Sequence, residues 1–391
     1  MKNNRTFLKK LLNGAEIEWK PLGKVTDIKT GQSVSKNIIA QNPGIYPVIN
    51  SGREPLGFIN EWNTENDPIG ITTRGAGVGS ITWQEGKYFR GNLNYSVTIK
   101  SEYELNVRFL YHILLHFQKE IHNLCSFTGI PALNPSELKK LEIPIPPLPV
   151  QTEIVKILDA LTALTSELTS ELTLRRKQYE YYREKLLSEE ELGKVGFEWR
   201  TLGDVAKIQR GASPRPISQY ITDDPNGIPW IKIGDTSLDS KYIENTAQKI
   251  TVEGAEKSRI LKCGDFVMSN SMSYGRPYIL KISGAIHDGW ASISDFENIL
   301  NSDFLYYYLS SNTVQNYWNG KINSSSVSNL NSDIIKSLPI PIPTLNIQIE
   351  IAKTLDKFET LTNSITEGLP LAIEQSQKRY EYYRELLLNF S

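Results

Sequence analysis

The chain has 391 residues, of which 39% are hydrophobic and 22% charged, and its formal net charge is −1 at pH 7. This length exceeds what one hydrophobic core usually supports, so we expect two or three domains. There is no run of eighteen apolar residues and no apolar signal segment, which argues against a membrane span and against secretion. The two cysteines share no motif spacing, which argues against a disulfide framework or a zinc ribbon. These features indicate a cytoplasmic protein.

The near-neutral total conceals an uneven distribution of charge. Residues 1–150 hold 17 lysines and arginines against 13 aspartates and glutamates, and residues 192–344 hold 15 of each kind. Residues 151–191 and 345–391 are net acidic. A local basic surface is compatible with this composition, although charge alone supports nucleic-acid binding only weakly.

The first elements in chain order are a short apolar stretch, FLKKLLNG, and the segment EWKPLGKVTDIKTGQSVSK from Glu18. Residues 37–132, the first insert, follow them. Short β-rich runs between turns at glycine, asparagine and aspartate predict an insert with more strand than helix. Its clearest helix pattern is VRFLYHILLHFQKEIHNL from Val107.

A long helix is predicted after the proline-rich segment IPIPPLP at Ile143–Pro149, because proline holds the chain extended. Alternating spacings of four and three residues then indicate a coiled-coil seam. About 36 helical residues span about 54 Å. The stretch also contains tandem four-residue units, LTAL-TSEL-TSEL, at Leu161–Leu172. The seam positions are Ile154, Leu158, Leu161, Thr165, Leu168, Leu172, Arg175, Tyr179, Tyr182 and Leu186.

Most of the sequence outside the inserts, here called the frame, occurs twice. The segment from Glu18 matches EWRTLGDVAKIQRGASPRP from Glu198, and the segment from Leu133 matches LNSDIIKSLPIPIPTLNIQIEIAKTLDKFETL from Leu330. The string YEYYRE occurs at Tyr179 and again near the end of the chain. A further copy of the N-terminal stretch FLKKLLNG would begin there. The second insert, residues 217–329, shares little sequence with the first. We therefore expect a circular pseudo-twofold repeat with duplicated frames and divergent inserts.

The second long helix is expected to differ from the first in one respect. Its seam runs through Ile351, Leu355, Phe358, Ile365 and Leu369 and then gains four residues before Tyr380. Such an insertion is a stutter in the heptad pattern, and Gly368 and Pro370 lie beside it. We predict a kink there.

The loops of both inserts carry side chains suited to reading DNA. The favoured contacts with bases are those of arginine with guanine and of asparagine or glutamine with adenine. These side chains, together with those of lysine and serine, also bind phosphates. The alternative for each single residue is an ordinary solvated loop position. The candidates are Lys29, Gln32, Lys36, Asn50, Ser51, Arg53, Arg74, Arg90, Asn92, Asn94, Thr128, Arg210, Ser213, Arg215, Lys232, Asn270, Ser273, Tyr274, Arg276, His287, Trp290, Lys321, Ser324 and Ser325.

Several motifs that carry chemistry in other proteins are incomplete here. RGAGVGS at Arg74–Ser80 lacks the lysine and serine of a phosphate loop and the spacing of a dinucleotide motif. His112 and His116 lie four residues apart without the glutamate of a zinc-protease helix. His287-Asp288 has no nucleophile elbow beside it. We expect no catalytic residue and no metal site.

The Trp-x-x-Leu-Gly segments, the proline-rich segments followed by Gln151 and Gln348, the tetrapeptide units and the tyrosine strings together resemble the specificity subunit of a type I restriction–modification enzyme, close to its IC class. The resemblance covers the frames and not the inserts. It implies a non-catalytic DNA reader in which two target recognition domains, held apart by antiparallel helices, read an asymmetric bipartite sequence. It further implies two modification subunits, which methylate adenine N6 with S-adenosylmethionine, and two restriction subunits, which use ATP and Mg²⁺.

On this interpretation the fold is α+β, with two mixed, strand-rich target recognition domains at residues 1–148 and 191–343 and helical spacers at residues 149–190 and 344–391. Partner subunits would dock on the spacers at Leu168, Leu172, Tyr179, Tyr182, Arg183, Tyr380, Tyr383 and Arg384. Two other classes stay open: a solitary nuclease or methyltransferase, for which we find no motif, and a coiled-coil protein adaptor with two divergent binding heads.

Overall fold

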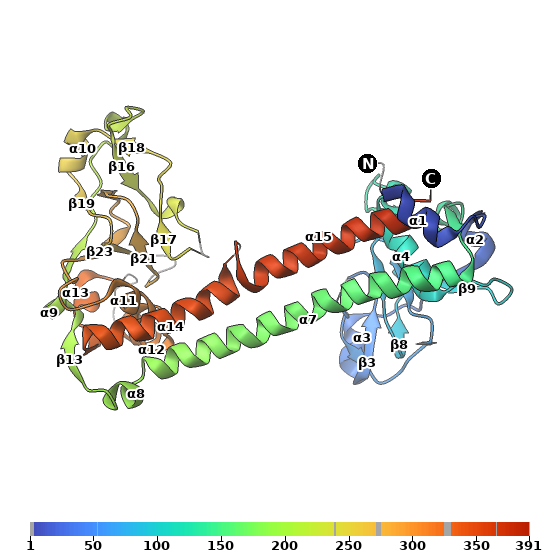
Figure 1. The fold of residues 1–391 in the computed structure, drawn as a ribbon, viewed down its shortest axis with the longest axis horizontal. Helices are drawn as coiled ribbons and strands as arrows, with labels where there is room; N and C mark the ends of the chain where they lie inside the picture. Colours follow the sequence, from blue (N-terminus) through green and yellow to red (C-terminus); the bar gives the residue numbers. More distant parts are fainter. Residues whose placement is uncertain are drawn as a thin grey trace. The chain divides into compact units, whose positions relative to one another are not determined.

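The computed structural model describes residues 4–52, 54–237, 240–270, 275–323, 330–364 and 366–390. The chain divides into two compact units. Unit 1 comprises Met1–Glu167 and Ile373–Ser391, and unit 2 comprises Leu168–Ala372. Each unit therefore joins one insert to parts of the helical spacers (Figure 1).

Unit 1 is a mixed α+β body with two four-stranded sheets, ordered β2-β9-β6-β7 and β4-β3-β8-β5. Its main hydrophobic core lies between the first of these sheets, α4, and the ends of α7 and α15. The elements are α1 (Asn4–Leu12), β1 (Glu18–Pro21), α2 (Leu22–Val25), β2 (Thr26–Thr30), α3 (Lys36–Gln41), β3 (Pro43–Ile49), β4 (Phe58–Ile59), β5 (Thr64–Glu65), β6 (Ile69–Thr72), β7 (Ile81–Trp83), β8 (Lys87–Arg90), β9 (Asn94–Ile99), α4 (Val107–His116), α5 (Gln118–Asn123), β10 (Cys125–Ser126), β11 (Ala132–Leu133), α6 (Pro135–Leu138), β12 (Glu142–Ile145) and the adjoining parts of α7 (Leu148–Leu186) and α15 (Gly368–Leu388).

Unit 2 repeats this plan with two five-stranded sheets, ordered β14-β23-β20-β21-β17 and β15-β18-β16-β22-β19. Its elements beyond α7 are α8 (Glu189–Gly193), β13 (Phe197–Thr201), α9 (Leu202–Val205), β14 (Lys207–Arg210), η1 (Ile217–Gln219), β15 (Ile221–Thr222), β16 (Ile228–Ile231), η2 (Ile233–Asp235), β17 (Tyr242–Ile243), β18 (Lys249–Ile250), α10 (Val252–Glu256), β19 (Arg259–Leu261), β20 (Phe266–Ser269), β21 (Pro277–Leu280), β22 (Gly284–Ile286), β23 (Trp290–Ser294), α11 (Ser302–Leu309), α12 (Asn312–Asn323), α13 (Ser332–Lys336), β24 (Pro339–Pro343) and α14 (Leu345–Asn363).

The duplicated frame forms the same small sheet in both units. β1 pairs with β12, which places Trp19 opposite Pro144, and β13 pairs with β24, which places Trp199 opposite Pro341. The proline-rich segments are therefore extended, as expected, but they are themselves strands. A two-stranded sheet tolerates their prolines because alternate N–H groups of an edge strand face away from the partner.

A buried glutamine clamps each long helix to the insert of its own unit. The Gln151 side chain accepts from the backbone N–H of Asn106 at 2.8 Å and donates to the carbonyl of Pro146 at 2.8 Å. Gln348 makes the equivalent bonds to Asn301 and Pro343, also at 2.8 Å. Both glutamines are fully buried, so their amides replace water for backbone groups that would otherwise be unpaired.

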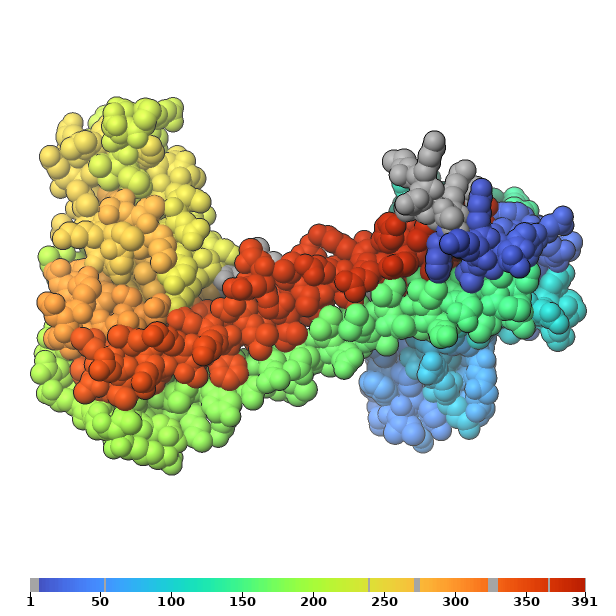
Figure 2. All heavy atoms as spheres, in the orientation of Figure 1, coloured from blue at the N-terminus to red at the C-terminus, as the bar shows by residue number. Residues whose placement is uncertain are grey.

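The predicted seam of the first long helix is confirmed. α7 is continuous over 39 residues, and all ten seam positions are buried or half-buried. In unit 1 the Thr165 hydroxyl bonds the Ser376 hydroxyl at 2.8 Å, and Figure 2 shows α15 lying against α7 there. In unit 2 the rings of Tyr182 and Phe358 stack at 5.5 Å between centroids.

The second long helix is interrupted where the stutter predicted a kink. α14 ends at Asn363 and α15 begins at Gly368. Gly368 has a φ of +80°, and a Cβ there would lie 2.6 Å from the Thr360 carbonyl oxygen, so only glycine fits. The seam position Ile365 lies outside the described residues. Among the helices described, none is long and apolar enough to cross a membrane.

Candidate nucleic-acid interface

Backbone hydrogen bonds gather the candidate loops of unit 1 at one edge. Gln32 N–H donates to the Arg90 carbonyl at 2.9 Å, and Gly91 N–H donates to the Ile49 carbonyl at 2.7 Å. Thr73 N–H reaches the Leu93 carbonyl. Segments 31–32, 50–51, 73–79 and 91–93, which are far apart in sequence, therefore form one loop cluster.

Asn50 shapes this cluster from inside. It is buried, its Oδ1 accepts from the Leu93 N–H at 2.9 Å, and a Cβ on Gly91 would lie 2.4 Å from that oxygen. Gly91 is thus required for the close approach of the two loops. The side chain of Asn50 is turned toward the protein, and the half-buried Ser51 follows it at the edge.

The prediction of a DNA contact is wrong for Arg90 and Asn94, because both are buried. The Arg90 guanidinium donates to Asn94 Oδ1 at 2.6 Å, to the backbone carbonyl of Asp67 at 2.6 Å and to that of Ile69 at 3.1 Å. Its ion pair with Asp67 measures 3.6 Å. Burial lowers the pKa of Arg90, and these acceptors compensate the buried charge. Arg90 therefore holds β6, β8 and β9 together.

The other described candidates of unit 1 are available to a partner. Arg53 lies outside the described residues, and the remaining candidates are exposed: Lys29, Gln32, Lys36, Arg74, Asn92 and Thr128. Arg74 and Thr128 belong to neighbouring segments, since Arg74 forms a β-bridge with Ala132 at the base of the β10–β11 hairpin. No observation on this chain tests their DNA contacts, which stay predictions.

The tip of the β10–β11 hairpin carries two exposed apolar side chains that sequence reasoning missed. Phe127 is 54% exposed and Ile130 is 68% exposed. The hairpin base is fixed on both sides, because Leu133 N–H donates to the Thr73 carbonyl and Gly75 N–H donates to the Pro131 carbonyl. This apolar tip therefore stands beside the exposed Arg74 on a well-anchored turn.

Unit 2 builds a corresponding loop cluster around Asp288. The Asp288 carbonyl accepts from Arg210 Nε at 3.2 Å and from Asn270 Nδ2 at 3.1 Å. Its carboxylate accepts from the Ser213 hydroxyl at 2.8 Å and pairs with Arg215 at 3.6 Å. Four of the predicted residues, Arg210, Ser213, Arg215 and Asn270, thus meet at Asp288, which the sequence indicated only as part of a His-Asp pair.

The charge of Asp288 is compensated within this cluster. Burial opposes its ionisation, but the Ser213 hydroxyl and the neighbouring His287 and Arg215 hold the pKa of Asp288 below its usual value. His287 Nε2 lies 3.1 Å from the carboxylate. Because Arg215 is 83% exposed, the cluster still offers a cation to a partner at its rim.

The remaining candidates of unit 2 divide into three groups. Trp290 is fully buried and donates from Nε1 to the Ile231 carbonyl at 3.1 Å, so its predicted DNA contact is wrong. Lys232 and Arg276 are half-buried and Lys321 is exposed. Four candidates lie outside the described residues: Ser273, Tyr274, Ser324 and Ser325.

The tyrosine strings mainly pack inward. Tyr179 is buried beside Phe358, so its predicted contact with another subunit is wrong. The other partner candidates are half-buried, and their contacts with another subunit stay predictions: Leu168, Leu172, Tyr182, Arg183, Tyr380, Tyr383 and Arg384. The exposed members are Tyr181, at 59%, and Tyr382, at 50%. These two are separated by the repeat offset of the strings.

A carboxylate on each long helix binds cationic or hydroxyl groups of the insert. Asp159 accepts from Arg108 Nε and lies 2.8 Å from His112 Nε2. In unit 2, Lys241 Nζ lies 2.9 Å from Asp356, and the Tyr307 hydroxyl bonds the same carboxylate. Although burial opposes its charge, the carboxylates of Asp303, at 2.8 Å from its ammonium, and of Asp356 raise the pKa of Lys241.

These ionisable groups serve packing between helix and insert. Desolvation is the largest cause of the lowered pKa of His112 and of the raised pKa of Tyr307, and both side chains are buried. Within the described ranges, no three histidine, cysteine, aspartate or glutamate side chains are grouped to hold a metal. Neither cluster aligns a nucleophile, a base and an oxyanion site, as a catalytic centre would.

Comparisons with known proteins agree with this architecture. The model of the type I restriction modification DNA specificity domain matches residues 15–174 and 194–375. A type I restriction enzyme specificity subunit of Haemophilus influenzae is 41% identical over 410 residues, covering 100% of both chains. The EcoR124I/EcoR124II specificity subunit of Escherichia coli is 33% identical over 412 residues, covering 98% of this chain and 97% of that one.

Solved structures support the fold. The type I restriction–modification S subunit from M. genitalium superposes with a TM-score of 0.61 at 18% identity, covering 97% of this chain and 98% of that chain. A chain from a structural study of complex assembly in a type I restriction–modification system gives the same TM-score at 16% identity. At this identity the likeness concerns the arrangement of elements.

Proposed function

The chain belongs to the family of type I restriction–modification DNA specificity subunits, and on that basis we propose that it reads an asymmetric bipartite DNA target, with one half-site read by each unit. As a specificity subunit it recognises a DNA sequence and is non-catalytic, since the catalytic activities of such complexes lie on partner subunits. The alternative of a coiled-coil protein adaptor is not favoured, because the family model matches both halves of the chain.

The observation that carries the proposal is the pairing of duplicated frames with unlike loop clusters. The frames form the same strand pair and the same glutamine clamp in each unit. The loops at the cluster edges differ, with Gln32, Arg74 and Asn92 in unit 1 against Arg210, Arg215 and Asn270 in unit 2. Because different side chains read different base edges, the two half-sites should differ.

The proposed partners follow from the same duplication. Two equivalent frames present two equivalent surfaces, which suits two copies of one modification subunit. The proposal assigns S-adenosylmethionine and adenine N6 methylation to those subunits, and ATP, Mg²⁺ and cleavage to two restriction subunits. Tyr181 and Tyr382 are exposed at equivalent positions of the two strings and are the aromatic side chains that such a subunit would reach first.

The test is to co-express the chain with its modification subunit in a host without adenine methylation and to map N6-methyladenine across the genome. A split motif with two unlike half-sites and a fixed gap is expected. A palindromic motif would contradict the assignment of one half-site to each unit. A stable complex that neither methylates DNA nor binds it in a salt-sensitive manner would contradict DNA reading by this chain.

A further inference from the structure

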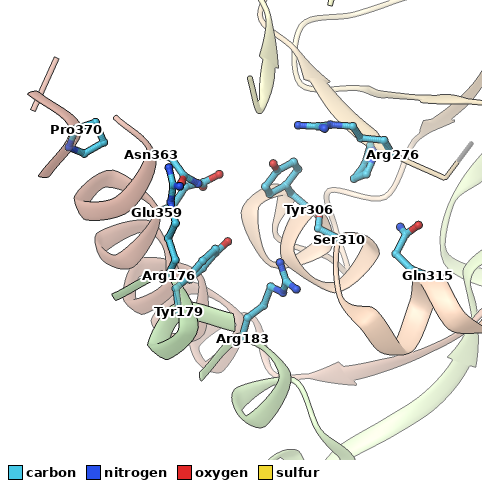
Figure 3. A pocket seen from close by; sticks show the side chains of 11 residues that line it. Arg176, Tyr179, Arg183, Arg276, Tyr306, Ser310, Gln315, Glu359, Asn363 and Pro370 are labelled. Atoms are coloured by element: carbon cyan, nitrogen blue, oxygen red, sulfur yellow. The ribbon is translucent and has the colours of Figure 1, made fainter. Parts of the chain in front are cut away.

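Unit 2 contains a pocket of about 580 Å³ between its long helices and its insert (Figure 3). Arg176 and Arg183 of α7 line one wall, and Arg276, next to the first residue of β21, lines another. Tyr306 of α11 and Glu359 of α14 also line the pocket. In Figure 3 the guanidinium groups of Arg183 and Arg276 both point toward the space around Tyr306.

Three cationic side chains face one carboxylate in this pocket, so its net charge is positive. That carboxylate, Glu359, lies 2.7 Å from the Tyr307 hydroxyl, whose single proton it shares with Asp356. Arg183 pairs with its neighbour Glu184 at 3.0 Å. Among the described residues, Arg176 and Arg276 have no carboxylate within ion-pair distance, which leaves two guanidinium groups to bind an anion.

Neutral hydrogen-bond donors stand beside these cations. Burial raises the pKa of Tyr306 to about 12, so its hydroxyl stays protonated and can donate at neutral pH. The exposed Asn363 amide lies at the end of α14, beside Glu359. Planar guanidinium groups with added hydroxyl and amide donors suit a tetrahedral oxyanion such as phosphate.

The pocket adjoins the loop cluster of the same unit. Asn270, which donates to the Asp288 carbonyl, and Arg276 flank residues 271–274, which lie outside the described residues. Gly275 N–H donates to the Ser269 carbonyl at 3.0 Å, so the described residues on the two sides of this gap lie close together. A strand of DNA read at the cluster would therefore pass next to the pocket.

We propose that this pocket binds one phosphate of the DNA backbone beside the half-site that unit 2 reads, with Arg176 and Arg276 as its principal ligands. This inference rests on the proposed function and adds a fixed backbone anchor to it. Such an anchor sets the register of the protein on the duplex and carries no base preference, because every nucleotide has the same phosphate. The base-reading loops next to it then meet their half-site in one register.

The test uses the complex with the modification subunits and measures DNA affinity as a function of salt. Arg276→Gln and Arg176→Gln each remove one guanidinium. The matched control is Arg200→Gln, since Arg200 is an exposed arginine of unit 2 that lies outside the pocket and pairs with Glu198. Loss of one phosphate contact makes the slope of log Kobs against log salt less steep by about 0.9. Between ~50 and ~200 mM salt, the factor by which affinity falls should therefore be about threefold smaller for each variant than for the wild type. The control should keep the wild-type slope.

A second measurement locates the phosphate. Duplexes with one uncharged methylphosphonate linkage at successive positions are bound to the wild type and to Arg276→Gln. We expect one linkage beside the half-site of unit 2 at which the methylphosphonate lowers the DNA affinity of the wild type but does not lower that of Arg276→Gln. Base preferences at both half-sites should stay unchanged.

The outcomes separate this inference from the proposed function. If wild type and variants bind DNA with equal slopes and no linkage shows coupling, the phosphate pocket is wrong and DNA reading stands. If the variants instead lose the modification subunit, the pocket holds acidic side chains of that partner, which also overturns the inference. If the wild-type complex shows no salt-sensitive DNA binding, the proposed function itself fails.

Discussion

Replacing Gln348 with alanine should loosen unit 2 and leave unit 1 intact. The fully buried Gln348 amide accepts from the N–H of Asn301 and donates to the carbonyls of Pro343 at 2.8 Å and Ile299 at 3.0 Å. Asn301 caps α11, so the clamp joins the start of α14 to the start of the insert helix. Alanine leaves three buried backbone groups without this partner.

The magnitude follows from the desolvation of those groups. An unsatisfied buried donor or acceptor costs about 1–3 kcal/mol. Three such groups set a range of about 3–9 kcal/mol, and entry of water into the space left by the side chain places the expected loss near the lower end, at about 3 kcal/mol. A loss of this size raises the rate of amide exchange in α11 by about two orders of magnitude when exchange proceeds through opening of the joint.

Hydrogen exchange measured by mass spectrometry resolves the two units. Gln348→Ala should accelerate exchange in peptides of α11 and the start of α14, and Gln151→Ala should do the same for α4 and the start of α7. Asn346→Ala is the control, because Asn346 is exposed two residues from Gln348 on the same helix. Unchanged exchange in α11, or equal acceleration in α4 and α11 for either variant, would refute the local clamp.

Three further predictions concern spacing, modularity and pH. Removing one tetrapeptide unit, Thr165–Leu168, shortens α7 by about 6 Å, which corresponds to at most about two base pairs of the gap in the methylated motif; an unchanged gap would contradict this ruler. Exchanging residues 217–329 for the insert of a relative should change one half-site only, and sequencing of methylated sites would expose a change in both. Burial lowers the pKa of His112, so the unfolded chain takes up the His112 proton before the folded chain does as pH falls through about 6.5. Unit 1 should therefore lose stability toward acid pH. Urea unfolding should show a weaker pH dependence of stability for His112→Gln.

The frame was predictable because its signals are local. Alternate spacings of four and three residues describe a helix seam, and every seam position on α7 is shielded. Gly368 marked the break in the second helix because its backbone conformation excludes other residues. The repeat added long-range information, since Trp19 and Trp199 could be matched before either strand partner was known. In contrast, nothing local showed that the proline-rich segments pair with those strands.

The loop residues were less predictable because burial is decided by distant segments. Arg74 and Arg90 both follow short β-rich runs and precede glycine, yet Arg74 is exposed and Arg90 is enclosed by one carbonyl of β6, one of β9 and Asp67. Only the sheet order β2-β9-β6 brings these acceptors around Arg90. Residue type and loop position therefore identify cations in such an insert but do not separate a structural cation from a candidate ligand of DNA.

The tyrosine strings show how the helical period separates packed from exposed positions. Tyr179 and Tyr182 are seam positions, and a seam residue packs against the paired helix. A contact with another subunit is wrong for the buried Tyr179 and stays a prediction for the half-buried Tyr182. Tyr181 lies off the seam at a half-turn from Tyr179, and it is exposed together with its repeat partner Tyr382. The helical period alone would have selected these two.

The two kinds of joint between helix and insert differ in how strictly they constrain the insert. Among the described residues, Gln348 hydrogen-bonds the second insert through backbone groups, so any insert with a helix in that place can satisfy it. Asp356 instead depends on side chains, the ammonium of Lys241 and the hydroxyl of Tyr307, and in unit 1 the equivalent Asp159 is satisfied by an arginine and a histidine. Backbone recognition explains how divergent inserts share one frame, whereas the carboxylate requires each insert to supply its own donor, because an unpaired, partly buried charge destabilises the joint. Exchange of inserts between relatives should therefore preserve folding where the incoming insert brings such a donor with it.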